Sequence, residues 1–573
     1  MMTYRENYER WLSSDKVDEA TKAELRSIAD NDEEIRFRFV KDLEFGTGGL
    51  RGTMMAGTNA MNVYTVAHAT QGLSDLINKE GKAEMGVAVG CDSRNNSRLF
   101  AETAARVLAA NGIKVHLFPE IEPTPVLSFA VRELHCIAGI NITASHNPKQ
   151  YNGYKAYWDD GAQLPPDHAK TVSEFIAAAD IFDDVKMITL DEGIKSGLIT
   201  YIGNDLIETY LSKVIAEAVN PDVIAKVADD LKIVYTPLHG TGRVLVPEVL
   251  KRVGLKHIYP VEEQMIPDGD FPTVSFPNPE YPAVFELGIK LAEKVGSDLI
   301  IATDPDADRM GIMSRDKTGK FVCLTGNQVG ALLLDYIIKA YETTGMPENP
   351  YAVKTIVTTE IVTEICRRHN IRLFNVLTGF KFIGEVIKKY ETTGHDTYIF
   401  GFEESYGYLK GTYARDKDAV VATMLLCEMA AYYKTKNMTL RDALDELYET
   451  YGNYGEGAAN IYMEGLDGLE KMKNLMDRLR NNPPKELAGY RVIQFRDYEK
   501  DTILDVDTGK VTPTGLPISN VLYFRTEPGD NIIIRPSGTE PKIKTYILVN
   551  GKDQDEVKAK IDAYSKVTET WTE

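Results

Sequence analysis

Four short segments of the chain combine residue types that bind phosphate, metal ions and sugar hydroxyls. Each follows or contains an apolar run that predicts a β-strand, so the polar residues would lie near strand ends. In parallel α/β folds, ligands bind at the carboxyl ends of the strands. The four segments are Thr143–Lys155 (TASHNPKQYNGYK), Asp298–Gly311 (DLIIATDPDADRMG), Ile399–Asp418 (IFGFEESYGYLKGTYARDKD) and Ile532–Lys544 (IIIRPSGTEPKIK).

The first segment offers a serine as a nucleophile. Ser145 comes shortly after the apolar run Cys136–Ile142, which predicts a strand, so its hydroxyl would lie at the carboxyl end of that strand. The Gly-x-Ser-x-Gly elbow of hydrolases is absent, so acyl transfer is not indicated. The alternative is an ordinary turn, because Ser, His, Asn and Pro are common turn residues.

The second segment places three carboxylates after an apolar strand. Asp304, Asp306 and Asp308 alternate with other residues, so their carboxylates would gather on one side of a tight turn. Like charges this close are costly unless a hard divalent cation offsets them. With three protein carboxylates, such an ion keeps positions open for a phosphate oxygen and water, as Mg²⁺ prefers. A solvated acidic turn is the alternative.

The third segment displays a carboxylate beside a hydroxyl. In an extended chain, the side chains of Glu403 and Ser405 would point the same way. Together they suit the neighbouring hydroxyls of a sugar. A turn or capping role explains this pair equally well.

The fourth segment has the composition of a phosphate site. A predicted strand delivers Arg535 into a Pro-Ser-Gly-Thr turn, which offers a guanidinium, two hydroxyls and backbone N–H groups to one anion. The Gly-x-x-x-x-Gly-Lys spacing of a Walker loop is absent. A polar hairpin turn is the alternative. The segment would supply local positive charge in a chain whose formal net charge is −20.

Three repeated strand–helix–strand units precede or contain the first three segments. The opening strand-like runs are Met85–Cys91, Leu231–Pro237 and Val353–Thr359, and the runs that follow them are Ala105–Phe118, Pro247–Pro260 and Thr363–Val376. Each following run has helical spacing, then a Gly or Asn suited to a helix C-cap, then a β-rich stretch. Short connections predict parallel pairing within each unit. Ser97 is the predicted N-cap of the first helix.

A different pattern begins near residue 455. A helical stretch is followed by several strand-like runs and a C-terminal helix, which predicts a separate α+β domain. These runs are 465–480 (helix), 491–495, 521–524, 532–534 and 545–549 (strands), and a helix from about Asp555. The fold class is therefore α/β with four domains, three of them repeated mixed α/β domains with largely parallel sheets. The predicted domain boundaries are 1–200, 201–320, 321–455 and 456–573.

The composition limits the classes of protein that fit. The chain has 573 residues, 43% of them hydrophobic and 26% charged, and a chain of this size divides into several domains. No run approaches the ~18 uncharged apolar residues that span a bilayer. The negative charge argues against nucleic acid or an anionic membrane as partner. The polar N-terminus and the five scattered cysteines predict a cytoplasmic protein, with no obligate protein partner evident.

With the four segments in this order, the sequence resembles the α-D-phosphohexomutase family of phosphoglucomutases and phosphomannomutases. FGTGGLRG, at Phe45–Gly52, is similar to the signature of that family's first domain. The likeness covers nearly the whole chain and is greatest to the long bacterial phosphoglucomutase branch, which is similar to vertebrate phosphopentomutase-type members. It implies a phosphoserine domain, a metal-binding domain, a sugar-binding domain and a phosphate-binding domain around one cleft.

The resemblance also implies a role for each candidate residue. The implied catalytic residues are Ser145, Lys155, Lys417, His146 and Arg51. The implied ligands of one Mg²⁺ ion are Ser145, Asp304, Asp306 and Asp308. The implied substrate-binding residues are Arg309, Thr378, Gly379, Glu403, Ser405, Arg535, Ser537, Gly538 and Thr539. Of these, Lys155 and Lys417 are the candidates for general acid and general base.

The implied reaction interconverts glucose 1-phosphate and glucose 6-phosphate through a phosphoserine. Glucose 1,6-bisphosphate would serve as intermediate and activator. Phosphomannomutase, phosphopentomutase and glucose-1,6-bisphosphate synthase activities remain alternatives, as do a Mg²⁺-dependent phosphatase and a non-catalytic sugar-phosphate-binding protein. The phosphomannomutase branch carries a His shortly after the Glu-x-Ser pair, whereas this chain has Tyr406-Gly407-Tyr408, which modestly favours glucose.

Overall fold

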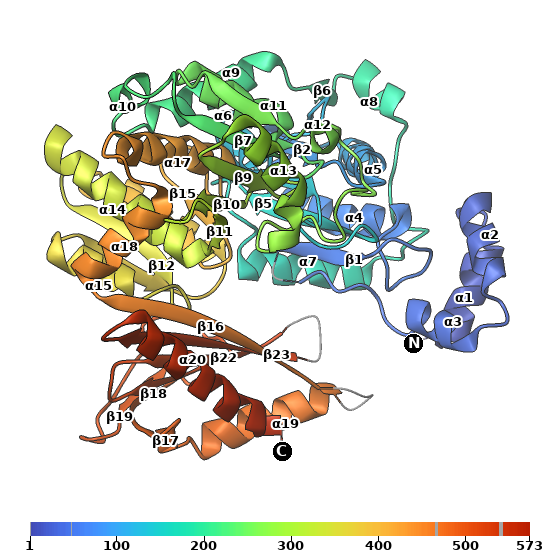
Figure 1. Cartoon of the computed structure of the whole chain (residues 1–573). Coiled ribbons are helices and arrows are strands. Elements are labelled where there is room, and N and C mark those ends of the chain that lie inside the picture. Colours follow the sequence, from blue (N-terminus) through green and yellow to red (C-terminus); the bar gives the residue numbers. More distant parts are fainter. Residues whose placement is uncertain (1, 47, 464–467, 538–541, 573) are drawn as a thin grey trace. The chain divides into compact units, whose positions relative to one another are not determined.

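The computed structural model describes the chain except residues 1, 47, 464–467, 538–541 and 573 (Figure 1). The chain forms two compact units, each built around two sheets. Unit 1 comprises Met1–Leu324, Ile387–Thr392 and Gly407–Thr439. Unit 2 comprises Thr325–Val386, Thr393–Tyr406 and Leu440–Glu573.

The first sheet of unit 1 joins a parallel centre to an antiparallel edge. In spatial order its strands are β1 (Gly49–Thr53), β5 (Tyr151–Trp158), β4 (Ala138–Ile142), β2 (Val87–Cys91), β3 (Val115–Leu117) and β6 (Ile199–Tyr201). The last four pair in parallel, and β5 pairs antiparallel with both β4 and β1. β2 and β4 are buried along their whole length, as expected for strands covered on both faces.

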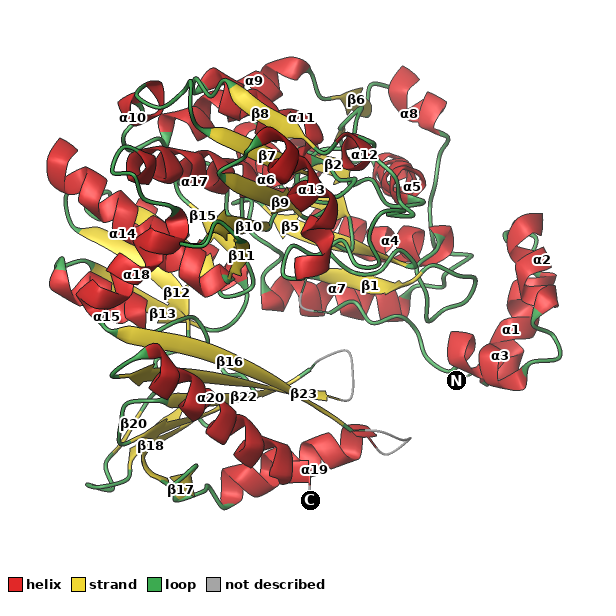
Figure 2. Ribbon diagram, in the orientation of Figure 1, coloured by secondary structure: helices red, strands yellow, loops and turns green. Residues whose placement is uncertain are grey.

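Helices cover both faces of this first sheet (Figure 2). α5 packs against β2 and β4, and α6 contacts the same two strands. α4 packs on α5 and on α7. Because β2–α5–β3 and β3–α6–β4 cross in opposite directions, the right-handed rule places α5 and α6 on opposite faces. The bounds are α4 (Val63–Lys79), α5 (Ser97–Ala110), α6 (Thr124–Glu133) and α7 (Pro166–Ala178).

The start of α5 differs from the prediction. Ser97 is not the N-cap: Asn96 occupies that position with a left-handed φ of 63°, and Ser97 is the first helical residue. The Ser97 hydroxyl donates to Asp92 instead, at 2.7 Å. The sequence prediction was wrong here because a buried carboxylate from the preceding loop takes the hydroxyl that would have capped the helix.

The second sheet of unit 1 repeats the same plan. In spatial order its strands are β11 (Phe321–Leu324), β10 (Met310–Arg315), β9 (Leu299–Thr303), β7 (Lys232–Thr236) and β8 (His257–Pro260). β9, β7 and β8 pair in parallel, and β10 and β11 form the antiparallel edge. α11 (Gly242–Arg252) connects β7 to β8, and α13 (Glu286–Val295) packs on β7 and β9.

Unit 1 also contains three N-terminal helices that were not predicted from the sequence. Trp11 is 1% exposed and packs edge-on against Phe39, Tyr64 and Phe182. The three helices are α1 (Tyr4–Ser13), α2 (Glu19–Ser27) and α3 (Asp32–Phe39). The remaining elements of unit 1 are α8 (Leu190–Lys195), α9 (Asn204–Ala216), α10 (Asp222–Ala225), α12 (Glu262–Met265), β15 (Gly407–Leu409) and α17 (Ala419–Lys434).

Unit 2 contains the third parallel repeat. β12 (Pro350–Thr355) pairs in parallel with β13 (Arg372–Val376) and with β14 (Thr397–Glu403). The strand predicted over 353–359 therefore begins and ends earlier than expected. The helices of this part are α14 (Gly326–Thr344), α15 (Ile361–Arg368), α18 (Leu440–Tyr451) and α16 (Phe380–Glu391), which begins in unit 2.

All three predicted helix ends are confirmed by backbone geometry. The residues just after α5, α11 and α15 adopt positive φ at Gly112 (75°), Gly254 (100°) and Asn370 (55°). Gly and Asn tolerate this left-handed conformation, which ends the helix and turns the chain into the next strand. The strands that flank these helices pair in parallel in each repeat.

The rest of unit 2 is the predicted α+β region. Its sheet is antiparallel, with strands in the order β16 (Asn453–Tyr462), β23 (Lys542–Gly551), β22 (Asn531–Pro536), β21 (Leu522–Thr526), β18 (Tyr490–Asp497), β19 (Thr502–Asp505) and β20 (Val511–Thr512), with β17 (Glu486–Leu487) beside β18. Its helices are α19 (Gly468–Asn481) and α20 (Gln554–Glu569). In the described residues, no helix is both long enough and apolar enough to cross a membrane.

Candidate active site

The loop after β4 holds the candidate nucleophile in a constrained geometry. Ser145 is 3% exposed and has a φ of 51°, in the left-handed region that non-glycine residues rarely adopt. Its backbone N–H donates to the Thr143 hydroxyl at 2.8 Å. Its own hydroxyl donates to Asp304 Oδ2 at 2.6 Å, and His146 Nδ1 lies 3.1 Å from the same oxygen. The structure therefore brings the predicted serine directly against the predicted metal loop.

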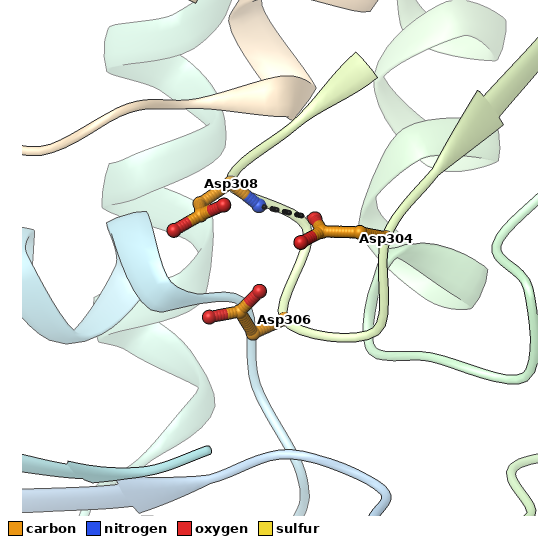
Figure 3. Close-up of side chains that lie close together, drawn as sticks. All are labelled: Asp304, Asp306 and Asp308. Atoms are coloured by element: carbon orange, nitrogen blue, oxygen red, sulfur yellow. Dashed lines mark hydrogen bonds between the residues drawn. The ribbon is translucent and has the colours of Figure 1, made fainter. Parts of the chain in front are cut away.

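The loop after β9 brings its three carboxylates together (Figure 3). Asp304 Oδ1 accepts hydrogen bonds from the backbone N–H groups of Asp308, at 3.1 Å, and Arg309, at 3.0 Å. Ala307 has a φ of 50°, which makes this turn tight enough for the chain to fold back on Asp304. The backbone of the loop thus holds the Asp304 carboxylate, and the side chains of Asp306 and Asp308 lie close to it.

Thr124, at the start of α6, supports the second carboxylate of this loop. The hydroxyl of Thr124 donates to Asp306 Oδ2 at 2.8 Å, and its backbone N–H donates to the Asp306 carbonyl at 2.8 Å. Asn141, inside β4, in turn donates to the Thr124 hydroxyl at 2.8 Å. The sequence analysis missed Thr124, because only the packing of the two sheets brings it to the metal loop.

The two predicted lysines also meet these carboxylates. Lys155 Nζ lies 2.7 Å from Asp306 Oδ2 and 3.2 Å from Asp308 Oδ2. Lys417 Nζ lies 3.2 Å from Asp308 Oδ2. Lys155 belongs to the antiparallel strand β5, so its position depends on the strand pairing that follows the serine loop.

A buried carboxylate that the sequence analysis missed holds Lys417 from the other side. Asp416 Oδ1 lies 3.0 Å from Lys417 Nζ, and Asp416 Oδ2 accepts a hydrogen bond from the Tyr157 hydroxyl at 2.8 Å. Tyr157 lies on β5, two residues after Lys155. Lys155 is thus held by Asp306 and Asp308, and Lys417 is held between Asp308 and Asp416.

The three carboxylates fit a hard divalent cation. Their oxygens can lie within 4.8 Å of one another, and all three residues are buried. Asp306 Oδ1 and Asp308 Oδ1 are buried without a hydrogen-bond partner. Burial and the charges of Asp306 and Asp308 raise the pKa of Asp304 well above its usual value. Oxygen ligands left unpaired in a cluster of like charges are the donor set that Mg²⁺ binds.

Two of the other residues predicted near the serine, Arg51 and Arg309, are cations whose charges act on the neighbouring His146. Burial, together with the charges of Arg309 and Arg51, lowers the pKa of His146 well below its usual value. His146 is therefore a neutral imidazole at pH 7, suited to a hydrogen bond with the serine or its phosphate. Arg51 is on β1, opposite Gly153 of β5, and Arg309 lies 3.8 Å from Asp308.

In unit 2, Glu403 and Gly379 are brought together. Glu403 ends β14, and its Oε1 accepts a hydrogen bond from the Gly379 N–H at 2.9 Å. Thr378, next to Gly379, is half-buried. Glu403 and Ser405 were predicted to share one extended chain, and this prediction is wrong. Residues 404–406 form a turn in which Tyr406 has a φ of 66°.

The predicted phosphate segment is described only in part. Arg535 lies on β22 opposite Lys544 of β23, and the Ser537 N–H donates to the Lys542 carbonyl at 2.8 Å. A strand therefore leads through Arg535 toward the turn, as predicted. Gly538 and Thr539 lie outside the described residues.

Three regions of the chain match the domains of one family. Residues 42–181 match the phosphoglucomutase/phosphomannomutase α/β/α domain I, residues 208–319 match domain II, and residues 325–451 match domain III. The chain is 38% identical over 541 residues to a phosphoglucomutase of Staphylococcus aureus strain MRSA252, and 37% identical to that of strain MSSA476. Both alignments cover 93% of this chain and 94% of the relative.

Solved structures share the fold at lower identity. They include pp63/parafusin, a phosphoglucomutase from Paramecium, with a TM-score of 0.67, and a phosphoglucomutase/phosphomannomutase family protein from Burkholderia thailandensis, with a TM-score of 0.64. The identities are 19% and 18%, over 92% of this chain and 94% and 97% of the other chains. The matched domains and the full-length relatives together show that the chain belongs to the phosphoglucomutase/phosphomannomutase family and is a phosphohexomutase enzyme.

Proposed function

We propose that the protein interconverts glucose 1-phosphate and glucose 6-phosphate by way of a phosphoserine at Ser145. The observation that carries this proposal is the 2.6 Å hydrogen bond from the Ser145 hydroxyl to Asp304, the first of the three clustered carboxylates. A hydroxyl beside a cation site is suited to accept and release a phosphoryl group, because the cation offsets the charge of the transferred group. The names of the Staphylococcus relatives support glucose as the sugar.

In the first half of the proposed reaction, phosphorylated Ser145 gives its phosphoryl group to the free hydroxyl of a bound sugar phosphate. The hydroxyl oxygen attacks phosphorus, and the Ser145 oxygen leaves as its P–O bond breaks. Lys155 or Lys417, whichever is the neutral amine once substrate is bound, takes the hydroxyl proton. Both lysines already face carboxylates of the metal loop, at 2.7 Å and 3.2 Å. His146 and Arg51 would contact the phosphoryl oxygens, with Arg309 offsetting their charge.

Asp304, Asp306, Asp308 and the Ser145 oxygen would hold one Mg²⁺ ion, which when bound supplies neutralising charge next to the phosphoryl group. The protein's own residues do the rest of the positioning. Thr124 and Lys155 fix one oxygen of Asp306, so that its unpartnered oxygen remains directed into the cluster.

In the second half, the bisphosphorylated sugar turns so that its other phosphate faces Ser145. The Ser145 oxygen attacks that phosphorus and loses its proton, the P–O bond to the sugar breaks, and the sugar oxygen takes up a proton and leaves as the product hydroxyl. Glucose 1,6-bisphosphate is the proposed intermediate, and it would also act as activator by phosphorylating Ser145 directly. Because the same groups must accept both orientations, recognition has to rest on features common to the two ends of the sugar.

The proposed recognition residues belong to unit 2. Glu403 and Ser405 would bind sugar hydroxyls, with Thr378 and Gly379 beside them. The proposed contacts to the non-reacting phosphate are Arg535, Ser537, Gly538 and Thr539. The four proposed domains keep the boundaries 1–200, 201–320, 321–455 and 456–573, and we propose that the enzyme works in the cytoplasm without a nucleic-acid or membrane partner.

A coupled assay for glucose 6-phosphate, started with glucose 1-phosphate, tests this function. The wild-type protein with Mg²⁺ and a trace of glucose 1,6-bisphosphate should turn over, and Ser145→Ala should show no turnover. Mannose 1-phosphate and ribose 1-phosphate, assayed in parallel, should give lower kcat/KM. Release of inorganic phosphate in place of product would contradict the mutase, and higher kcat/KM for another sugar would contradict glucose as the preferred substrate.

A further inference from the structure

One arginine outside the reacting groups holds the whole serine loop. Arg94 follows β2, and its side chain is fully buried. Its guanidinium donates to four backbone carbonyls, those of Ser145 (2.5 Å), Asn147 (2.5 Å), Pro148 (3.0 Å) and Tyr151 (3.0 Å). Asp92 lies 3.4 Å from the same guanidinium. The planar fork of an arginine can reach several acceptors in fixed directions, which a lysine cannot do.

The loop needs such support because its backbone is strained. Ser145 sits at a φ of 51° without being glycine, and a residue held in this region costs of order 1 kcal/mol or more. Such a conformation persists only where the surroundings impose it. The hydrogen bonds from Arg94 to the carbonyls of Ser145 and of residues 147, 148 and 151 restrain the backbone of this loop.

A second segment, in the connection between β8 and β9 of the second sheet, packs against Arg94. Phe271 is 2% exposed, and its ring centre lies 5.0 Å from the guanidinium carbon of Arg94. At Gly269, an added Cβ would lie 2.3 Å from the Asn95 nitrogen, so the two loops are in close contact. Asp270 lies 3.3 Å from Lys149 of the serine loop. We call residues 267–273 the clasp.

We propose that Arg94 and Phe271 are positioning residues for phosphoryl transfer: the clasp presses Arg94 against the serine loop and so aligns Ser145 with the aspartates. Neither residue touches the reacting atoms. The clasp follows β8 and precedes β9, the strand that leads into Asp304. The clasp and the three aspartates therefore belong to one continuous stretch of chain. In the proposal, this stretch positions Ser145, which follows β4 of the first sheet. The proposal rests on the proposed role of Ser145.

The proposal predicts a change in rate with little change in binding. Arg94→Lys keeps the charge but loses the fork, so the first-order rate of phosphoryl transfer should fall about 10- to 100-fold, as expected for a small misplacement of a reacting group. KM should stay within about three-fold, because substrate contacts are unchanged. Phe271→Leu should lower the rate about three- to ten-fold through the same displacement.

The experiment uses the full chain, with Ser145 phosphorylated by glucose 1,6-bisphosphate beforehand. Phosphorylated enzyme is mixed with glucose 6-phosphate, and loss of phosphate from the protein is followed by rapid quench and intact mass. The double variant Arg94→Lys/Phe271→Leu should be no slower than Arg94→Lys alone, because Phe271 acts through Arg94. Arg98→Lys and Phe100→Leu, both on α5, are the matched controls and should transfer phosphate at the wild-type rate.

Each outcome decides a separate point. A wild-type transfer rate in Arg94→Lys, or a loss confined to KM, overturns the proposal. Rate losses that multiply in the double variant overturn the role of the clasp, since they would mean that Phe271 acts independently of Arg94. If Arg94→Lys does not fold, Phe271→Leu alone decides, and a wild-type rate there overturns the proposal. Failure of wild-type protein to carry phosphate on Ser145 would instead refute the proposed function.

Discussion

The serine–aspartate centre of unit 1 and the proposed recognition residues of unit 2 are built in different ways. In unit 1, Ser145 is 3% exposed and Asp304 and Asp306 are 0% exposed, and each is fixed by hydrogen bonds from distant parts of the chain. In unit 2, Glu403 is buried at 6% exposed, but Thr378, Ser405 and Arg535 are half-buried at strand ends and turns.

This difference matches the different demands on the two regions. Phosphoryl transfer depends on groups already held in line, since positioning and charge stabilisation supply most of the rate. Recognition has to accept a sugar in two orientations, which suits side chains at the surface of a site. Substitutions in the serine–aspartate centre of unit 1 should therefore lower kcat, and substitutions of the proposed recognition residues of unit 2 should raise KM.

The largest effect is expected at the metal loop. Asp306→Asn removes a charge from the cluster, and kcat should fall about 1,000-fold or more, because the charge stabilisation lost amounts to several kcal/mol. The coupled assay over a range of Mg²⁺ concentrations measures this, with the exposed carboxylate variant Asp229→Asn as control. A kcat within ten-fold of wild type at saturating Mg²⁺ would remove Asp306 from the centre.

The next effect is expected at a lysine of the same centre. Lys155→Met leaves Asp306 and Asp308 without this cation and removes one proton carrier, so kcat should fall about 100-fold or more, the range of general acid–base catalysis. KM should change little. Steady-state kinetics at several pH values measure both quantities, with the exposed Lys170→Met on α7 as the matched control. A change confined to KM would show that Lys155 binds substrate without taking part in proton transfer. It would contradict the assignment of Lys155 to the serine–aspartate centre.

A smaller effect, of the opposite kind, is expected in unit 2. Arg535→Ala removes a proposed charge-assisted hydrogen bond to phosphate, worth about 1.5–3 kcal/mol, so KM should rise roughly 10- to 100-fold. If Arg535 acts only in recognition, kcat should stay within a few-fold. Arg491→Ala, on the exposed side of β18, is the control. An unchanged KM with a strongly reduced kcat would show that unit 2 takes part in the chemistry.

The smallest effect concerns stability and not turnover. Burial raises the pKa of Glu456 on β16 to about 7, although hydrogen bonds with Thr359 and Asn327 oppose the shift. A raised pKa means that the folded state favours the protonated form, so this contribution to stability is present below the unfolded pKa, near 4.5, and is lost as the pH rises through 7.

Glu456→Gln stays neutral at every pH. It should therefore raise the unfolding free energy by on the order of 1–3 kcal/mol at pH 8 and have little effect at pH 4.5. Thermal unfolding at the two pH values measures this, with the exposed Glu470→Gln on α19 as control. Equal stabilisation at both pH values would rule out ionisation of Glu456 as the cause.

The sequence predicted those features that depend on nearby residues. The helix ends at Gly112, Gly254 and Asn370 were found because left-handed backbone favours Gly and Asn wherever the fold places it. The loops of Ser145 and of the aspartates were found because each follows a strongly apolar strand. Ser97 was misplaced because its hydroxyl bonds to Asp92 and not to its own helix.

The features that escaped prediction depend on contacts between distant segments. Thr124 reaches Asp306 across 182 positions, and Tyr157 reaches Asp416 across 259. Arg94 and Phe271 meet only when two sheets pack. In the sequence each is an ordinary polar or aromatic residue. The turn over 404–406 was missed because residues 403–406, Glu-Glu-Ser-Tyr, include no glycine or proline that would indicate a turn.

The most direct test of the account is the location of phosphate on the protein during turnover. Active enzyme is incubated with Mg²⁺ and glucose 1,6-bisphosphate, quenched in acid, and examined by intact mass and peptide mapping. The account predicts one added phosphate, on the peptide that contains Ser145, which disappears when glucose 6-phosphate is added. Phosphate on another residue, or full turnover with no phosphate on the protein, would contradict it.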